Sequence, residues 1–478
     1  MCGIARSMEE FRWRRHPEGT VLHQVVKDAL PEYRELARAF GRYPGFIEKA
    51  FEEYLDCGIP ERAGYVLVEC EECGHWEKVV CSCGRRGVCP YCAKRRMWEE
   101  AAELVEKVLP AVPYRHVVVS YPYGINLKVG FQPKLLTEVE GKVMEEVQRW
   151  QRERGLPLVG GVLFRHRFGE DLELFIHCHI LMFDGPFRLE PVAFNAQTRH
   201  PEVWREVEIE QRDIDELAAR VWKRIKGLLA RRGIEAGKKS EPVAKPAPPQ
   251  MELFAAKVGE RERGGAAVGP QEEDEVEHPT DGMWARVEGL HVCVSQLIDG
   301  ADRKNLEKLC RYFLRPSFSL SRLGRRADGK VTYRLRRKDK AGNTVLVMEP
   351  VAFLARIANL IPGPRQRTRR LFGMLAPRAA KRKEVMPKVA KKRCNDDRTE
   401  KEKAAAAEAI QHRLDWDDLL ERTLGVKPLR CPGCGGRMRV IRKAVKIERN
   451  AVGRRAIDLS PPARGPPLGE DAPVQTAA

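Results

Sequence analysis

Alternating apolar and polar positions place two histidines on one face of a predicted strand. Residues 174–183 read Leu-Phe-Ile-His-Cys-His-Ile-Leu-Met-Phe and follow a Gly-Glu-Asp turn, a pattern typical of a β-strand. One face of this strand is wholly apolar and consists of Leu174, Ile176, Cys178, Ile180 and Met182. His177 and His179 share the other face, from which both imidazoles can reach one divalent ion. The alternative is a pair of ordinary core or surface histidines, and the apolar opposite face favours the metal site.

A third histidine depends on the register of a hairpin. Residues 162–168 form an apolar run that ends just before the turn, which predicts a strand paired with 174–183. A two-residue loop places His166 opposite Phe175 and on the face of His177, whereas a three-residue loop places it on the apolar face. Because two-residue loops are the commoner hairpin type, His166 is a candidate third ligand.

Other segments show helical or strand periodicity. Helices are predicted over 20–57, 95–109, 133–155, 213–232, 301–315, 350–360 and 400–411. Strands are predicted over 114–120, 329–336 and 344–348, and a turn at 122–124. A strand, a helix packed over it and then a hairpin make an α+β plan.

The predicted helix 301–315 carries a tyrosine away from its apolar stripe. Tyr312 lies roughly 130° from the centre of the stripe around the helix axis. It shares the polar face with Lys308 and Arg315. An isolated tyrosine is usually a core or interface residue. A phenol flanked by two cations, however, lies where a phosphate would be held and where its own ionisation would be favoured.

The cysteines form knuckles with the spacing of zinc sites. Two Cys-x-x-Cys knuckles, separated by residues 74–88, match the loops that fold around tetrahedral zinc. The predicted zinc ligands are Cys70, Cys73, Cys89 and Cys92, with Cys83 in reserve and Cys81 and His75 as further substitutes or ligands of a second ion. A further knuckle at 431–434 has no obvious second half in the sequence. Its site would need Cys394, a histidine or another chain.

Composition indicates a polyanionic partner. Lys and Arg number 86 against 68 Asp and Glu, a net charge of +18, and nucleic acid is the expected partner. We expect no membrane partner, because no apolar run of about 18 residues occurs. We also expect no small-molecule substrate. The N-terminus lacks a secretory pattern, so a cytoplasmic location is expected. In a reducing compartment, fourteen cysteines are metal ligands or buried thiols rather than disulfides.

Several cations are candidates for contacts with DNA. Arg95 and Arg96 follow the second knuckle together with Trp98, and could press on phosphates while the indole stacks on a base. A solvated helix face is the alternative for these three residues. The remaining candidates lie on the tyrosine helix and are Lys308, Arg311 and Arg315.

Composition also suggests a domain plan. The predicted parts are a helical support (1–60), a zinc-binding domain (61–108), the sheet core with the histidines (110–190), an insertion with a disordered linker (191–283), a tyrosine-bearing half of the core (284–375) and a basic C-terminal region with a Cys-x-x-Cys knuckle and disordered tail (376–478).

Together these motifs resemble the HUH-class rolling-circle insertion-sequence transposases, in particular the one-tyrosine branch associated with common-region elements. The resemblance runs from about residue 55 to about residue 440, interrupted by the linker. It is carried by CEECGH (70–75), SCGRRGVCPYC (82–92), RFG (167–169), IHCH (176–179), LCRYFLRP (309–316), LDWDDLL (414–420) and RCPGCGGRM (430–438). HUH denotes His, hydrophobe, His, and Cys178 fills the middle place.

The resemblance implies an α+β fold with an antiparallel-sheet nuclease core, helices, a small N-terminal zinc-binding domain and a C-terminal basic and Cys-knuckle region. It makes His177 and His179 ligands of a catalytic divalent ion and Tyr312 the nucleophile. Members of the family that the chain resembles have glutamine at the position of His166, before Arg-Phe-Gly. Two-tyrosine members have a second tyrosine four residues earlier, where this chain has Lys308, which excludes a mechanism using two tyrosines on this helix.

The implied activity is that of a DNA transposase, which nicks and rejoins single-stranded or hairpin DNA through a 5′-phosphotyrosine. Its implied cofactors are structural Zn²⁺ and catalytic Mg²⁺ or Mn²⁺. A plasmid replication initiator or relaxase with the same chemistry is one alternative, and a zinc-dependent DNA-binding protein without catalysis is another. A buried Tyr312, or one more than about 10 Å from the histidine rings, would favour the inactive protein.

Overall fold

The computed structural model describes residues 11–12, 16–41, 44–85, 87–156, 159–169, 171–184, 209–234, 282–336, 338, 342–364, 366–387, 430–450 and 453–458. The chain forms two compact units. A smaller unit comprises 1–17, 56–83 and 428–478, and a larger unit comprises 18–55 and 84–427. Among the described residues, no helix combines the length and apolarity needed to cross a membrane.

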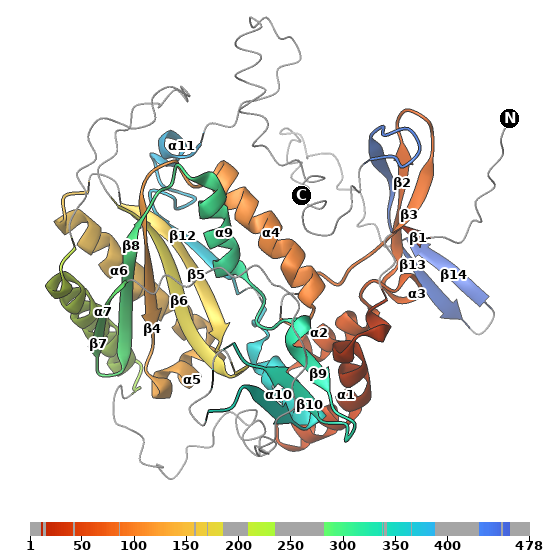
Figure 1. The fold of residues 1–478 in the computed structure, drawn as a ribbon, viewed down its shortest axis with the longest axis horizontal. Helices are drawn as coiled ribbons and strands as arrows, with labels where there is room; N and C mark the ends of the chain where they lie inside the picture. The colour runs from red at the N-terminus through yellow and green to blue at the C-terminus, as the bar shows by residue number, and fades with distance from the viewer. Residues whose placement is uncertain are drawn as a thin grey trace, which may run out of the picture. The chain divides into compact units, whose positions relative to one another are not determined.

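A six-stranded antiparallel sheet is the centre of the larger unit (Figure 1). Its order is β12-β5-β6-β4-β8-β7. The strands are β4 (Tyr114–Ser120), β5 (Gly160–Phe168), β6 (Leu174–Phe183), β7 (Gly282–Val287), β8 (Leu290–Ile298) and β12 (Arg369–Gly373). The mixed α+β class with an antiparallel sheet is therefore confirmed.

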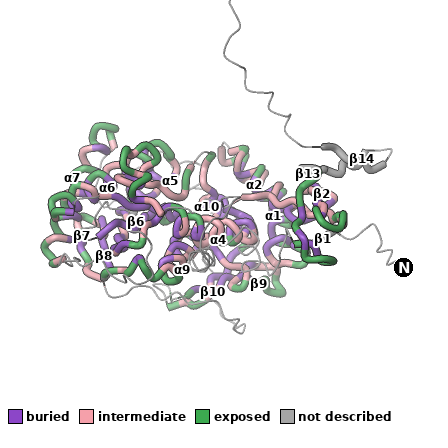
Figure 2. The backbone as a smooth tube through the Cα atoms, turned by 90° about the horizontal axis from the view of Figure 1, so that it is seen from above, coloured by how far each residue is buried: buried purple, intermediate pink, exposed green. Residues whose placement is uncertain are grey.

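Helices cover both faces of this sheet (Figure 1). On one face lie α5 (Tyr123–Phe131), α6 (Pro133–Glu153) and α7 (Gln211–Arg231), and on the other lie α4 (Pro90–Lys107) and α9 (Arg303–Leu314). All five residues of the predicted apolar face of β6 belong to the core under α5, α6 and α7. That expectation is confirmed, and β6 runs through the molecule in the colour of buried residues (Figure 2).

The rest of the larger unit packs beside the sheet. It contains η1 (Pro17–Gly19), α1 (Val21–Ala39), α2 (Gly45–Asp56), η2 (Leu320–Arg322), α10 (Pro350–Leu360), α11 (Arg382–Val385) and a small sheet of β9 (Leu323–Arg325), β10 (Val331–Arg334) and β11 (Val345–Met348) in the order β11-β10-β9. Helix α1 packs against α10. The helical region predicted over 20–57 consists of two helices, α1 and α2.

The smaller unit joins segments from both ends of the chain in one sheet. Its strands are β1 (Phe11–Arg12), β2 (Tyr65–Cys70), β3 (Trp76–Val80), β13 (Met438–Asn450) and β14 (Gly453–Asp458), in the order β1-β3-β2-β13-β14. The short helix α3 (Pro60–Ala63) precedes β2. Strand β13 pairs antiparallel with β2, with Met438 opposite Cys70.

One local prediction is wrong and others lie outside the described residues. The turn predicted at 122–124 is instead the start of α5, which begins at Tyr123 with Pro122 as its N-cap. This helix is apolar on most sides, so it lacks the polar stripe that helical periodicity needs. Most of the insertion linker, most of the basic run and the helix predicted over 400–411 lie outside the described residues.

Candidate active site

Three histidines meet where β5 and β6 pair. His166 lies directly opposite His177, and His179 lies opposite Phe164. The connection spans 169–173, so it is neither of the two short loops expected, and a register shift precedes it between His166 and Phe168. Residues directly opposite in an antiparallel pair share a face. From the pairing of Phe168 with Leu174 alone, His166 would lie opposite Ile176 on the apolar face. The register shift moves it opposite His177, and so brings it to the side of His177 and His179.

The three rings present one nitrogen each to a common centre. Their potential ligand atoms all lie within 4.8 Å of one another. His177 Nδ1 donates to the carbonyl oxygen of Phe175 at 3.1 Å, which leaves Nε2 for the centre. His166 Nε2 donates to the carbonyl oxygen of Phe313 at 2.6 Å, which leaves Nδ1. These outer partners set the tautomer and orientation of a ligand ring.

His179 is held by a fourth histidine that the sequence analysis missed. His179 Nε2 lies 3.1 Å from His166 Nδ1, and its Nδ1 lies 2.8 Å from Nε2 of His116 on β4. The rings of His116 and His179 stack at 5.1 Å. The available signal was a histidine in the middle of the predicted strand 114–120. Its pairing partner could not be read from the sequence, because β4 and β6 are far apart in the chain.

Burial keeps these imidazoles neutral. It lowers the pKa of His177 to about 4, and the nearby charge of Arg315 acts in the same direction. The pKa values of His166 and His179 are also well below the usual value, first through burial and then through neighbouring charges. Neutral imidazole is the form that binds a metal. Three converging neutral nitrogens fit a divalent cation with positions open for other ligands.

Tyr312 lies beside this centre but is buried. Its ring centroid is 5.7 Å from that of His179, and the residue is only 6 % exposed. The sequence placed it on a polar helix face, whereas in the structure Tyr312 itself belongs to the buried core around Phe313. A buried Tyr312 and a large separation from the histidine rings were the two features expected of an inactive protein. The burial of Tyr312 is present, and the large separation is absent.

The cations near Tyr312 have different surroundings. The Arg315 guanidinium lies over the Tyr312 ring at 4.1 Å, and Lys308 is exposed. Arg311 lies over the Trp98 ring at 3.8 Å and pairs with Glu307. Arg311 thus covers the indole predicted to stack on a base. Since Trp98 belongs to α4 and Arg311 to α9, the pair links these two helices. Arg95 is 3.5 Å from Glu99 on its own helix.

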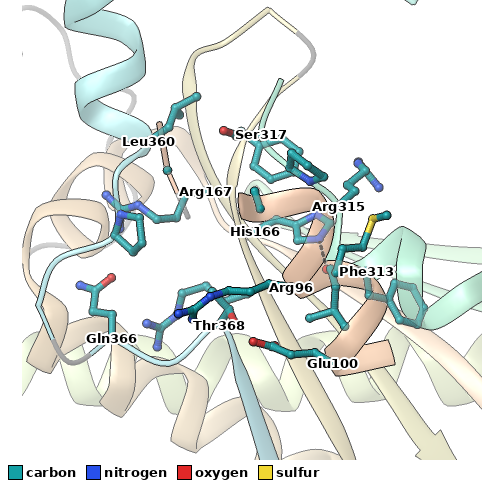
Figure 3. Close-up of a pocket in the computed structure, with 18 of the residues that line it drawn as sticks. Arg96, Glu100, His166, Arg167, Phe313, Arg315, Ser317, Leu360, Gln366 and Thr368 are labelled. Carbon is teal, nitrogen blue, oxygen red and sulfur yellow. Dashed lines mark hydrogen bonds between the residues drawn. The ribbon is translucent and has the colours of Figure 1, made fainter. Parts of the chain in front are cut away.

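A pocket opens next to the histidines (Figure 3). His166, Arg315 and Arg96 lie on its wall, with Gln366 and Thr368 on the segment that leads into β12. Arg167 also lines it and donates to the carbonyl oxygens of Gly130 and Asn359. Sequence reasoning missed Gln366 and Thr368, because no motif or periodicity distinguishes them. The concentration of cations suits an anionic ligand.

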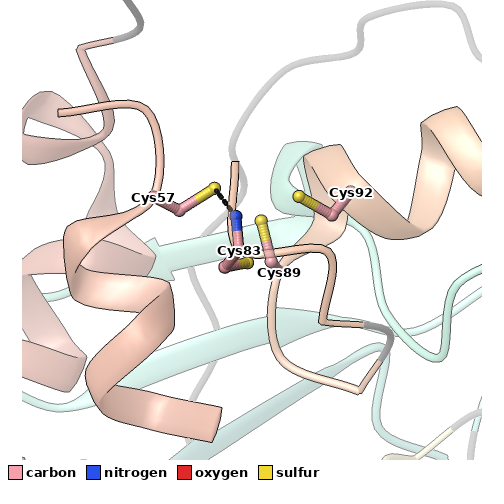
Figure 4. A group of neighbouring side chains, drawn as sticks. All are labelled: Cys57, Cys83, Cys89 and Cys92. Atoms are coloured by element: carbon pink, nitrogen blue, oxygen red, sulfur yellow. Dashed lines mark hydrogen bonds between the residues drawn. The ribbon is translucent and has the colours of Figure 1, made fainter. Parts of the chain in front are cut away.

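The predicted zinc ligands belong to two different clusters. The thiols of Cys57, Cys83, Cys89 and Cys92 face one another within 4.8 Å (Figure 4), and the backbone N–H of Cys83 donates to Cys57 Sγ at 3.3 Å. The other cluster consists of Cys70, Cys73, Cys431 and Cys434. The structure therefore does not bring the knuckle at 70–73 together with the knuckle at 89–92. The Cys-x-x-Cys spacing identifies two ligands of each cluster, but the fold determines which other two cysteines complete it.

Comparison with protein families found two matches along the chain. A model described as "Transposase zinc-binding domain" matches residues 25–121, and a model described as "Putative transposase" matches residues 160–384. Comparison with curated proteins and with solved structures found no match. The first range contains the whole cluster around Cys57, which offers the four thiolates of a structural zinc site. The second contains His166, His177, His179 and Tyr312. The chain therefore carries a transposase zinc-binding domain of the IS91 type and a "Putative transposase" domain.

Proposed function

We propose that this transposase nicks and rejoins single-stranded DNA in rolling-circle transposition, with Tyr312 as the nucleophile. One observation carries the proposal. Three neutral imidazoles offer ligand atoms within 4.8 Å of one another, and the ring of a tyrosine lies 5.7 Å from one of them. A metal-activated phosphate and a phenol need this proximity to react.

The chemistry follows from these groups. His166, His177 and His179 would hold the ion, which when bound polarises the scissile phosphate and neutralises its charge. Tyr312 Oη attacks phosphorus, the bond to the 3′ oxygen breaks, the phenol loses its proton and the 3′ oxygen gains one. The 5′-phosphotyrosyl ester retains the bond energy for later rejoining without ATP. Histidine ligands favour Mn²⁺ over Mg²⁺.

The Arg315 side chain would move away from Tyr312 when the substrate binds. Its guanidinium covers the Tyr312 ring at 4.1 Å and also lies over Phe168 at 5.4 Å. A phosphate entering from the pocket would attract this guanidinium, since charge-assisted bonds to phosphate are stronger than a contact with a ring. The burial of Tyr312 would then end when DNA binds.

The same burial supports one alternative, a zinc-dependent DNA-binding protein that has lost catalysis. A replication initiator or relaxase would use the same chemistry, but the transposase zinc-binding domain favours the transposase.

A covalent adduct decides between the active and inactive proteins. Labelled single-stranded DNA from the flanks of the gene is incubated with protein and Mn²⁺ and run on a denaturing gel. We expect an adduct that is lost in Tyr312→Phe and kept in Tyr333→Phe, which removes a buried phenol from β10. Tight binding of the same DNA with no adduct would support the inactive protein.

A further inference from the structure

We propose that Cys70, Cys73, Cys431 and Cys434 bind a zinc ion of their own, which joins the two ends of the chain in one zinc ribbon. The sulfur atoms are 3.5 Å apart between Cys70 and Cys434, 3.6 Å between Cys73 and Cys431, and 3.4 Å between Cys73 and Cys434. Tetrahedral zinc with bonds of about 2.3 Å places its sulfur ligands about 3.8 Å apart. A disulfide requires about 2.05 Å.

The two knuckles are built in the same way. In the first, the backbone N–H of Gly74 donates to the Cys70 carbonyl at 3.1 Å, and the N–H of Cys70 donates to the His75 carbonyl at 2.7 Å. In the second, the N–H of Gly435 donates to the Cys431 carbonyl at 2.9 Å, and the N–H of Cys431 donates to the Gly436 carbonyl at 2.8 Å.

The glycine of each knuckle adopts the same unusual conformation. Gly74 has a φ of 69° and Gly435 a φ of 73°, a region that glycine enters without steric cost. The knuckle at 89–92 is different, because it forms the start of α4 with Pro90 in the first turn. The knuckles at 70–73 and 431–434 therefore share one geometry. Neither matches the knuckle at 89–92, although that knuckle is nearer to 70–73 in the sequence.

The strands hold these knuckles face to face. Met438 lies opposite Cys70 in the pairing of β13 with β2, and the N–H of Glu71 donates to the Arg437 carbonyl at 2.9 Å. Around the thiols, the buried core of described residues consists only of Val68, Cys70, Cys431 and Met438. So small a core supplies little hydrophobic stabilisation, and small units of this kind commonly need a metal.

The ligand set crosses the boundaries of both family matches. Cys70 and Cys73 lie inside the zinc-binding model at 25–121, whereas Cys431 and Cys434 lie beyond residue 384, where the transposase model ends. The zinc-binding domain would thus contain one complete site around Cys57 and half of another. Segment 430–458 would supply the second half and become part of the N-terminal fold.

Cysteine alkylation of the zinc-loaded wild-type protein tests the proposal without any variant. Cys73 and Cys434 are exposed, so in the absence of a metal they should react readily. We expect all four thiols to be protected together and to become reactive together after zinc is removed. Cys81 is partly buried and belongs to neither cluster, so it serves as the internal control. Reaction of Cys434 at an undiminished rate in the zinc-loaded protein would overturn the proposal.

Zinc content of variants supplies a second measurement. Cys431→Ser with Cys434→Ser and Cys70→Ser with Cys73→Ser should each lose one equivalent of zinc, and all four changes together should lose no more. Cys81→Ser should lose none. If the Cys431 and Cys434 variant kept all its zinc, or if changing both the 70–73 and 89–92 knuckles cost only one equivalent, the sites would be paired differently.

Discussion

At the scale of single residues, His116 is the group on which the orientation of His179 depends. A cation at the centre would take Nε2 of His179 as its ligand, so the proton of that ring would stay on Nδ1 and be donated to His116 Nε2, 2.8 Å away. Outer partners of this kind raise the basicity of a ligand and restrict its rotation. His116 does not contact the centre itself and acts as a positioning residue.

His116→Leu should weaken Mn²⁺ binding about 10- to 100-fold, because it leaves the N–H of His179 without an acceptor. His116→Gln retains an oxygen acceptor and should recover part of the affinity. Titration of Mn²⁺ by calorimetry measures both. His23→Leu is the matched control, since His23 is equally buried at 4 % exposure and lies in α1. Equal losses in the two leucine variants would indicate a merely structural role.

The buried histidines also predict how the chelator-treated protein responds to pH. The folded state holds the pKa of His177 at about 4, against 6.5 for an ordinary histidine. Between these values the unfolded chain binds more protons, so the free energy of unfolding falls as the pH falls from 6.5 to 4. The slope is up to about 1.4 kcal/mol per pH unit for each such group. Urea unfolding should show a shallower slope in His177→Gln, and an unchanged slope would exclude this histidine as a cause.

Arg96 and Arg311 should differ in their effect on DNA. Arg96 lines the pocket, whereas Arg311 is held between Trp98 and Glu307. We expect Arg96→Ala to weaken binding of single-stranded DNA and to reduce the salt slope by about 0.7, the value for one phosphate contact. Arg311→Ala should leave the slope unchanged. Fluorescence anisotropy at several salt concentrations measures the slopes, and equal slopes for both variants would contradict the assignment.

At the scale of elements, the histidine strand is held in place by a helix that periodicity did not predict. The side chain of Asn126 in α5 donates to the Ile176 carbonyl at 3.0 Å and accepts from the Ile176 N–H at 2.5 Å. Asn126 is 1 % exposed, so water cannot replace these bonds. The amide thus fixes the backbone of β6 directly before His177.

Asn126→Ala should lower the free energy of unfolding by about 2 to 6 kcal/mol, because two buried backbone groups lose their partners at about 1 to 3 kcal/mol each. Chemical denaturation measures the loss. Gln148→Ala is the control, since its amide donates to a carbonyl within its own helix and is only partly buried. A similar small change in both variants would show that the backbone of β6 does not need this amide.

At the scale of the whole molecule, two thiols of the cysteine cluster around Cys57 lie at the start of one helix. Cys89 is the residue before α4 and Cys92 lies in its first turn. Helix α4 packs against α9, which carries Tyr312. Loss of a metal at the start of α4 should therefore affect α9, the helix that carries the proposed nucleophile.

Cys89→Ser together with Cys92→Ser should lower the melting temperature strongly, since structural zinc contributes directly to folding. Cys81→Ser, whose thiol belongs to neither cluster, should have little effect. Differential scanning fluorimetry with and without a chelator measures both. If chelation lowered the melting temperature of the double variant as much as that of the wild type, the stabilising metal would lie elsewhere.

Features that depend only on neighbouring residues can be predicted from the sequence. Strand periodicity predicts the shared face of His177 and His179, helical periodicity predicts most helices of the core, and the spacing of cysteines predicts each knuckle. These features follow from local backbone geometry, which repeats within a few residues.

Which of these segments contact one another depends on tertiary packing. The partner of the knuckle at 70–73 lies more than three hundred residues away in the sequence, and Cys434 is 364 positions from Cys70. The register of His166, the burial of Tyr312 and the contact of His116 with His179 likewise depend on how β4, β5, β6 and α9 pack. Such contacts form between segments that no local pattern relates, because the energy that selects them comes from packing across the whole core.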